Sequence, residues 1–247
     1  MTRRTNPRFR YTAVLGGAAA AAALLIGASQ LGVDRKEATE ATATTATTAT
    51  QIPAAPTAPE PSLFAGLEQQ GAALGSPEAP VTLVEYADLQ CPYCAQWSRD
   101  ALPTLVEDYV KTGKLRIVFR GLAFIGPDSD TALRTVISAG ENDHLWDVLH
   151  GLYLNQGHEN AGWVTDELVS EIAAGVQGLD GGALLDARWD DAVASELERA
   201  AQAARAAGVN GTPAFQVGPT GGSLELVHVE SLGPEGIVPA IEAVLAR

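Results

Sequence analysis

Residues 81–94 read VTLVEYADLQCPYC, and this stretch decides the fold. Its first seven residues are mostly apolar, which predicts a strand over residues 81–87 that is covered on both faces. Cys91 and Cys94 follow directly, and residues 95–110 then carry apolar side chains at helical spacing. The two cysteines are therefore expected at the junction between a buried strand and the N-terminus of a helix.

Cys91 and Cys94 are the only cysteines among the 247 residues. Two thiols three positions apart at such a junction are typical of a dithiol that cycles through a disulfide. A purely structural disulfide is disfavoured because so short a loop restrains the unfolded chain very little. A zinc site is disfavoured because zinc usually takes four ligands, no second CxxC exists, and the four histidines are scattered between residues 144 and 228. We therefore predict a redox-active Cys91–Cys94 disulfide, with no metal and no other cofactor.

The remaining patterns predict an α/β domain. A second strand is expected over residues 115–120, which places the cysteines at the carboxyl end of the first strand of a βαβ unit, where open α/β sheets hold their sites. Pro103 lies inside the intervening helical pattern and predicts a kink. Residues 63–74 give no firm assignment, and residues 155–163 and 175–182 are expected to be loops. Helices are expected over residues 130–139, 143–154, 165–174, 190–207 and 234–246, and strands over 214–217 and 224–229.

The first 62 residues differ from the rest. Residues 1–33 hold four arginines, no acidic residue and an apolar run over 13–28, whereas the whole chain has a net charge of −14. This order is typical of an export signal whose basic end stays in the cytoplasm, either cleaved as a signal peptide or kept as a membrane anchor over residues 12–33. Residues 34–62 are rich in Ala, Thr and Pro, which predicts a disordered tether. We expect residues 63–247 to form an extracytoplasmic domain, whose acidity argues against a nucleic-acid partner.

Four residues near the strand-to-helix junction receive expected roles. Cys91 is the expected nucleophile because the N-terminus of a helix stabilises a thiolate. Cys94 lies one turn further along the helix and is expected to resolve the mixed disulfide. Glu85, on the buried strand, is expected to have a raised pKa and to relay a proton to or from Cys94, unless the strand emerges and leaves it solvated. Asp88 is expected to shape the loop rather than to take part in catalysis.

Four motifs occur in order along the chain, SPEAPVT over residues 76–82, EYADLQCPYC over 85–94, LNQ over 154–156 and GVNGTPAF over 208–215. Together with the element order they resemble the DsbA-type thiol:disulfide oxidoreductases, in particular exported, N-terminally anchored bacterial members. The resemblance implies a thioredoxin fold with an inserted helical block, here about residues 128–189. It also implies a cis peptide bond between Thr212 and Pro213 that faces the CxxC motif and helps to bind substrate.

The expected function is that of an extracytoplasmic oxidase that introduces disulfides into secreted proteins, because export leads to a compartment where new chains need them. The CPYC sequence does not fix the direction of electron flow, since the same four residues occur in reducing glutaredoxins. A reductase or isomerase therefore stays open, slightly favoured by a threonine rather than a valine before Pro213, and so does a thiol metal-binding or chaperone module. The expected partners are reduced or unfolded secreted proteins and a quinone-linked membrane reoxidant, DsbB-like or VKOR-like.

Overall fold

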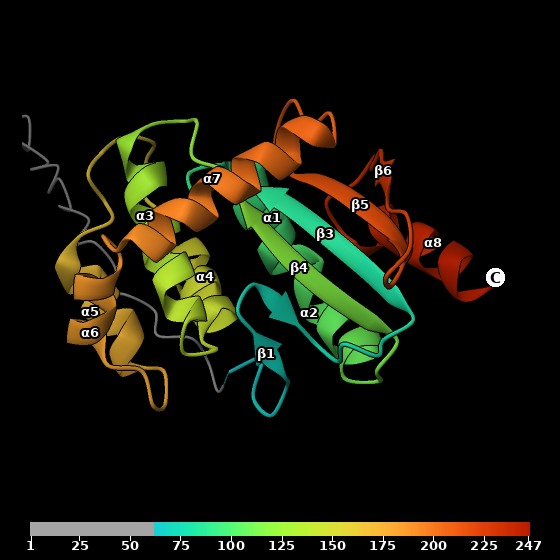
Figure 1. The fold of residues 1–247 in the computed structure, drawn as a ribbon, viewed down its shortest axis with the longest axis horizontal. Coiled ribbons are helices and arrows are strands. Elements are labelled where there is room, and N and C mark those ends of the chain that lie inside the picture. The colour runs from blue at the N-terminus through green and yellow to red at the C-terminus, as the bar shows by residue number, and fades with distance from the viewer. Residues whose placement is uncertain (1–61) are drawn as a thin grey trace, which may run out of the picture. The chain divides into compact units, whose positions relative to one another are not determined.

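The computed structural model describes residues 62–247 (Figure 1). The expected export signal over residues 1–33, and all but the last residue of the expected tether over 34–62, lie outside the described residues. Within residues 62–247, no helix has both the length and the apolar character that a membrane crossing requires.

A six-stranded mixed sheet forms the centre of the domain, and its strand order is β1-β2-β4-β3-β5-β6. The central strand β3 is buried at all seven of its residues, as its apolar sequence predicts. It runs parallel to β4 and antiparallel to β5, while the short β1–β2 hairpin lies on the other edge of β4. The strands are β1 (Gln69–Gln70), β2 (Ala73–Leu74), β3 (Val81–Ala87), β4 (Leu115–Gly121), β5 (Ala214–Pro219) and β6 (Glu225–Val227).

The helices follow the predicted order, with one addition. A helical block lies between β4 and β5, so the α/β prediction of a thioredoxin fold with an inserted helical block is confirmed. The additional helix, α6, starts at Gly181 in a glycine-rich segment that the sequence predicts as a loop. The helices are α1 (Pro92–Asp100), α2 (Leu102–Leu105), the π-helical turn η1 (Val106–Val110), α3 (Pro127–Gly140), α4 (Leu145–Leu154), α5 (Asp166–Ala174), α6 (Gly181–Ala187), α7 (Asp191–Ala206) and α8 (Pro234–Leu245).

The long helix after Cys91 is broken where Pro103 predicts a kink. Pro103 has no N–H to donate to the carbonyl oxygen of Arg99, four residues earlier, so the first helix ends at Asp100 and a new one starts at Leu102. In α2, Pro103 lies in the first turn, where a missing N–H costs little. The break leaves α1 as a short helix of nine residues that begins directly after Cys91.

The two faces of the sheet are covered differently. On one face, α1 packs through Trp97 against Phe215 of β5, with ring centroids 5.0 Å apart, and α4 packs through Trp146 against Phe119 of β4. On the other face, a smaller cluster that includes Val84 and Tyr86 is covered by the alanine-rich C-terminal half of α7. Figure 1 shows α1 and α2 behind the sheet and α7 crossing in front of it.

Candidate active site

The two thiols lie at the start of α1, as the sequence predicts. Cys91 is the residue before the first turn of the helix, and Cys94 lies within that turn. The side chain of Cys91 is 5% exposed and that of Cys94 is fully buried, while Tyr93 between them is 61% exposed. Both cysteines are free thiols, so the structure describes the reduced site. Of the two thiols, only Cys91 therefore has any surface exposed to solvent.

The surroundings of Cys91 favour its thiolate. The pKa of Cys91 is lowered to about 6, foremost by a hydrogen bond from the Cys94 thiol. The Thr212 side chain and the backbone N–H groups of Cys94 and Tyr93 lower the pKa further, while burial opposes them. Because these N–H groups belong to the first turn of α1, they have no partner within the helix and are free to stabilise the anion.

Cys94 has the opposite preference. Burial raises its pKa well above the ordinary value, and the hydrogen bond to Cys91, the charge of Cys91 and that of Glu85 raise it further. The pair therefore divides into an accessible thiolate at Cys91 and a buried, protonated thiol at Cys94.

The segment that carries Thr212 and Pro213 lies beside Cys91, although 121 residues separate Thr212 from it in the sequence. The Thr212–Pro213 peptide bond is cis, as the resemblance implies. In its protonated form the Cys91 thiol donates a hydrogen bond to the carbonyl oxygen of Thr212, at 3.4 Å. Thr212 and Pro213 line a cavity of about 470 Å³, together with Tyr93 and apolar residues of β5, β6 and the segment after β6, which include Leu226, Val229 and Leu232.

Glu85 is buried on β3, with 1% of its surface exposed. Burial raises its pKa to about 8. Its Oε1 atom has no hydrogen-bond partner within residues 62–247, and no hydrogen bond joins Glu85 to either thiol in that range. Glu85 is thus buried on its strand, as the sequence predicts, and its link to Cys94 is electrostatic.

Asp88 organises the loop before Cys91. Its Oδ1 atom accepts hydrogen bonds from the backbone N–H of Gln90 at 2.9 Å and from the hydroxyl of Ser129 at 2.6 Å. Its Oδ2 atom accepts from the backbone N–H groups of Phe124 and Ile125, at 3.0 and 3.2 Å. A fully buried carboxylate with four donors is a structural anchor, which confirms the expectation that Asp88 shapes the loop.

Residues of the helical block complete the site, and the sequence assigned them no role. The side-chain amide of Gln156 donates to the carbonyl oxygens of Leu89 and Cys91, at 2.7 and 3.1 Å. The side chain of Gln90 donates to Asn160 Oδ1 at 3.1 Å and accepts from the Asn160 backbone N–H at 2.6 Å. The LNQ motif over residues 154–156 was the available signal for Gln156, but a motif alone does not show what its side chain contacts.

No group of three or more His, Cys, Asp or Glu side chains within residues 62–247 is arranged to hold a metal ion.

The sequence matches one protein family and is similar to two Bacillus proteins. The family described as Thioredoxin matches residues 68–222. The probable disulfide bond formation protein D of Bacillus cereus is 37% identical over 112 residues, which make up 44% of this chain and 51% of that protein. The disulfide bond formation protein D of Bacillus subtilis is 26% identical over 146 residues, 58% of this chain and 66% of that protein. The match thus spans about half of the first relative and just under two thirds of the second.

Solved structures share the fold. The crystal structure of oxidised BdbD from Bacillus subtilis superposes with a TM-score of 0.62 at 23% identity, over 73% of this chain and 98% of that chain. The crystal structure of α-DsbA1 from Wolbachia pipientis superposes with a TM-score of 0.61 at 19% identity, over 71% of this chain and 90% of that chain. At this level of identity the superpositions establish the fold.

Proposed function

The chain belongs to the thioredoxin family, and from this premise we propose that it is a DsbA-type thiol:disulfide oxidoreductase that acts as an oxidase outside the cytoplasm. The observation that supports thiol:disulfide exchange is the division between the thiols, with the pKa of Cys91 lowered to about 6 and that of Cys94 raised well above its ordinary value. An accessible sulfur that is stable as an anion is both a good nucleophile and a good leaving group. The names of the Bacillus relatives, which refer to disulfide bond formation, support the same activity.

The proposed reaction starts from the Cys91–Cys94 disulfide, and no other cofactor takes part. A substrate thiolate attacks the sulfur of Cys91, the bond to Cys94 breaks, and Cys94 leaves and takes up a proton. The second substrate thiol loses its proton and attacks the substrate sulfur of the mixed disulfide, which expels Cys91 as a thiolate. The substrate is oxidised by two electrons, and the enzyme ends in the free-thiol form that the structure describes.

Glu85 is the proposed proton relay for Cys94. A carboxyl group with a pKa of about 8 holds a proton at neutral pH and can release it when a nearby thiolate forms. Cys94 is fully buried, so water cannot readily supply that proton. Its buried Oε1 atom has no partner within residues 62–247, so no hydrogen bond at that atom competes for the proton.

Thr212 and Pro213 are the proposed docking point for the substrate. They lie beside Cys91 and line the 470 Å³ cavity, whose apolar wall suits side chains that an unfolded protein exposes. The proposed substrates are therefore reduced or unfolded secreted proteins, which present a cysteine within an extended segment.

The direction of electron flow needs support beyond the thiol pKa. At pH 7, a pKa of about 6 stabilises the reduced form about tenfold relative to an ordinary thiol, which corresponds to about 30 mV. Thioredoxin and DsbA differ by about 150 mV, so this contribution alone does not make an oxidase. The export pattern over residues 1–33 supplies the further argument, because an exported enzyme meets newly secreted chains that need disulfides. A quinone-linked membrane protein, DsbB-like or VKOR-like, is the proposed reoxidant.

The test is the reduction potential of the full chain in glutathione buffers, combined with two assays, oxidative refolding of reduced ribonuclease A and reduction of insulin. We expect a potential above about −180 mV and refolding of ribonuclease A. A potential near the −270 mV of thioredoxin, with insulin reduction but no refolding, would identify a reductase. Cys94→Ser should trap substrate on Cys91 as a stable mixed disulfide, and Cys91→Ser should trap none; the reverse pattern would contradict the assigned roles.

A further inference from the structure

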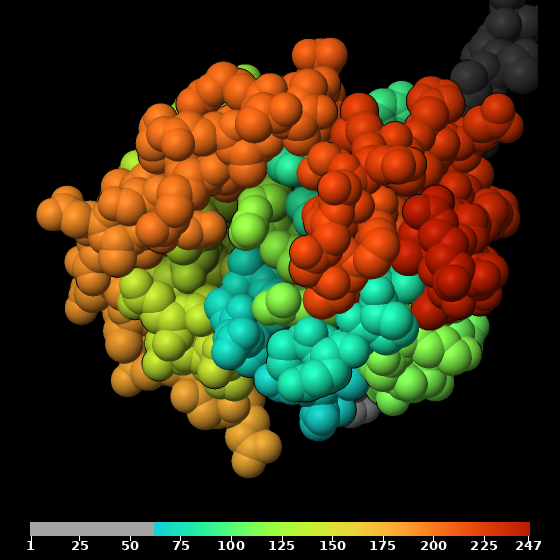
Figure 2. Space-filling view, turned by 45° about the vertical axis from the view of Figure 1, so that its right-hand side comes forward, coloured from blue at the N-terminus to red at the C-terminus, as the bar shows by residue number. Residues whose placement is uncertain are grey.

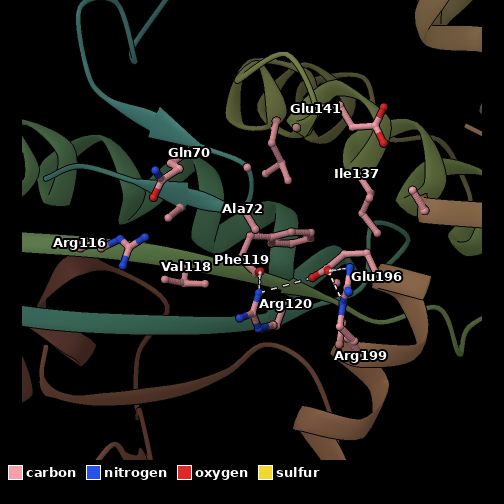
Figure 3. Close-up of a pocket in the computed structure, with 17 residues that line it drawn as sticks. Gln70, Ala72, Arg116, Val118, Phe119, Arg120, Ile137, Glu141, Glu196 and Arg199 are labelled. Atoms are coloured by element: carbon pink, nitrogen blue, oxygen red, sulfur yellow. Dashed lines mark hydrogen bonds and ion pairs between the residues drawn. The ribbon is translucent and has the colours of Figure 1, made fainter. Parts of the chain in front are cut away.

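A cavity of about 480 Å³ lies between the β1–β2 hairpin, β4, the C-terminal part of α3 and the part of α7 from Ala192 to Ala200. Figure 2 shows this face of the molecule hollowed beneath α7 (orange), and Figure 3 shows the side chains that line the hollow. None of Cys91, Cys94, Thr212 and Pro213 lines it, so it is separate from the thiol site. Its volume is in the range of pockets that bind small organic ligands.

The cavity exists because the hairpin covers only part of the edge of β4. β2 pairs with β4 at Ile117 and Val118, and one further hydrogen bond joins the backbone N–H of Phe119 to the carbonyl oxygen of Ala72. The chain then turns at Gly71, whose positive φ of 55° places it in the left-handed region. The edge of β4 beyond Phe119 therefore faces the cavity instead of another strand.

The inner wall of the cavity is apolar. Phe119, Leu145 and Ala200 are each at most 2% exposed and form its floor, and the side chains of Val118 and Ile137 border it. Figure 3 shows Ile137 and Phe119 between the charged groups at the rim. This wall suits the hydrocarbon part of a ligand.

The rim is locally cationic although the protein as a whole is acidic. Three arginines, Arg116, Arg120 and Arg199, line the cavity with only two acidic residues, Glu141 and Glu196, in a chain whose net charge is −14. Side chains alternate along a strand, so Arg116 and Arg120 of β4 lie on the same face as Val118. Phe119 lies on the opposite face, so a ligand meets both Phe119 and the guanidinium groups at the open edge of β4, where all of them line the cavity.

Two of these arginines have unused hydrogen-bond donors. The Nε atom of Arg116 is buried and has no partner within residues 62–247. Within the described part of the chain, Arg120 makes only a 3.5 Å hydrogen bond to the carbonyl oxygen of Phe119 and a 3.7 Å ion pair with Glu196, both at the limit of such contacts. Glu196 is held more closely by Arg199, at 2.7 Å. A guanidinium with five N–H donors and no close acceptor is suited to bind a carboxylate.

We propose that this cavity binds an amphipathic carboxylate, with its apolar body against Val118, Phe119 and Leu145 and its carboxylate on Arg120. Glu196 argues for a singly charged ligand, because a second negative charge beside its carboxylate would be repelled. The proposal concerns a site apart from the thiols, and does not depend on the direction of electron flow there.

The test uses cis-parinaric acid, a carboxylate whose fluorescence rises in apolar surroundings, and its methyl ester as a neutral probe with the same body. Both are titrated into the full chain, in wild type and variants. Because the sequence also has an apolar run over residues 13–28, the readout is the difference between variants. Arg120→Gln should weaken binding of the acid about tenfold and leave the ester within about twofold. The charge-matched control Lys111→Gln, on an exposed side chain paired with Glu107, should change neither.

A larger side chain that fills the cavity should weaken the binding of both probes. Ala72→Phe, and separately Ala192→Phe at an exposed position at the start of α7, should each weaken binding of both probes about tenfold or more. Two positions are used so that a folding defect in one does not decide the result. Equal affinity of wild type for acid and ester, or equal effects of Arg120→Gln and Lys111→Gln, would overturn the proposal, and so would unchanged binding in both filled variants. Thiol exchange is measured on the same samples and should remain at the wild-type rate, so the two proposals can fail independently.

Discussion

The side-chain amide of Gln156 donates a hydrogen bond to the carbonyl oxygen of Cys91, at 3.1 Å, and thereby joins the inserted helical block to the first turn of α1. The same amide donates to the carbonyl oxygen of Leu89 at 2.7 Å. The carbonyl oxygen of Cys91 also accepts a hydrogen bond from the backbone N–H of Ala95, so it keeps one donor without Gln156. Leu89 is fully buried, so water does not reach its carbonyl oxygen. The helical block thus fixes the position of the loop before the thiols through the side chain of Gln156.

Gln156→Ala is expected to lower the free energy of unfolding by about 1–3 kcal/mol, because the buried carbonyl of Leu89 loses this donor. Urea denaturation of the reduced protein measures the change. Gln202→Ala on α7 is the matched control, since the side chain of Gln202 makes an exposed bond to Glu198, and it should cost less than about 0.5 kcal/mol. Equal costs for the two variants would show that Gln156 does not hold the loop.

The rate of Cys91 alkylation is expected to rise with pH and to reach half its maximum near pH 6, because only the thiolate reacts and its pKa is lowered to about 6. Cys94→Ala should move the midpoint upward, since the Cys94 thiol is the largest cause of the lowered pKa. Thr212→Val should move it in the same direction by less. Iodoacetamide labelling followed by mass spectrometry gives all three midpoints. A larger effect of Thr212→Val than of Cys94→Ala would contradict this account.

Asp88→Asn keeps the shape of the side chain but places an amide N–H₂ where two donors already point. We expect a loss of about 3 kcal/mol in the free energy of unfolding, because a buried acceptor of four hydrogen bonds loses half of its capacity. The amides of Phe124 and Ile125 should also exchange faster with deuterium, which localises the effect. Asp100→Asn, at an exposed position at the end of α1, should change neither quantity.

Glu85→Gln is expected to change how stability depends on pH. The raised pKa means that the folded state keeps the Glu85 proton between pH 4.5 and about 8, where the unfolded state has lost it. The contribution is therefore fully present below pH 4.5 and is lost as pH rises towards 8, by at most about 5 kcal/mol. Wild type should lose stability relative to Glu85→Gln across this window. Both proteins are measured in the reduced state, so the opposite pH dependence that the lowered pKa of Cys91 adds to stability is the same in each and cancels in the comparison. Glu225→Gln, at an exposed position on β6, should follow wild type, and parallel curves for all three would refute the buried proton.

The sequence predicted the central elements because their signals are local. The apolar run over residues 81–87 is buried at every position, and Pro103 marks the break between α1 and α2. Helix α6 was missed because glycines obscure its start, although Asp180 is a good N-cap and accepts hydrogen bonds from the backbone N–H groups of Gly182 and Ala183. The strands β1 and β2 have two residues each, too few to show any periodicity.

The residues of the candidate site also fall into those that a local pattern predicts and those that it does not. Cys91 and Cys94 are recognisable from their spacing alone, whereas Gln90 and Asn160 meet across 70 residues of sequence. Contacts of that kind depend on how the helical block folds back onto the loop before α1, and no local pattern records them. The cationic cavity was missed for the same reason, because Arg120 and Glu196 come from distant elements.

The unequal thiols also determine how many protons accompany each pair of electrons. Between about pH 6 and the much higher pKa of Cys94, the reduced site holds one proton rather than two, because Cys91 is ionised and Cys94 is not. The reduction potential should then change by about 30 mV per pH unit in this range, and by about 59 mV per unit below pH 6, where both thiols are protonated. Potentials measured from pH 5 to pH 8 would show a bend near pH 6. A single line of the steeper slope would mean that both sulfurs carry protons throughout.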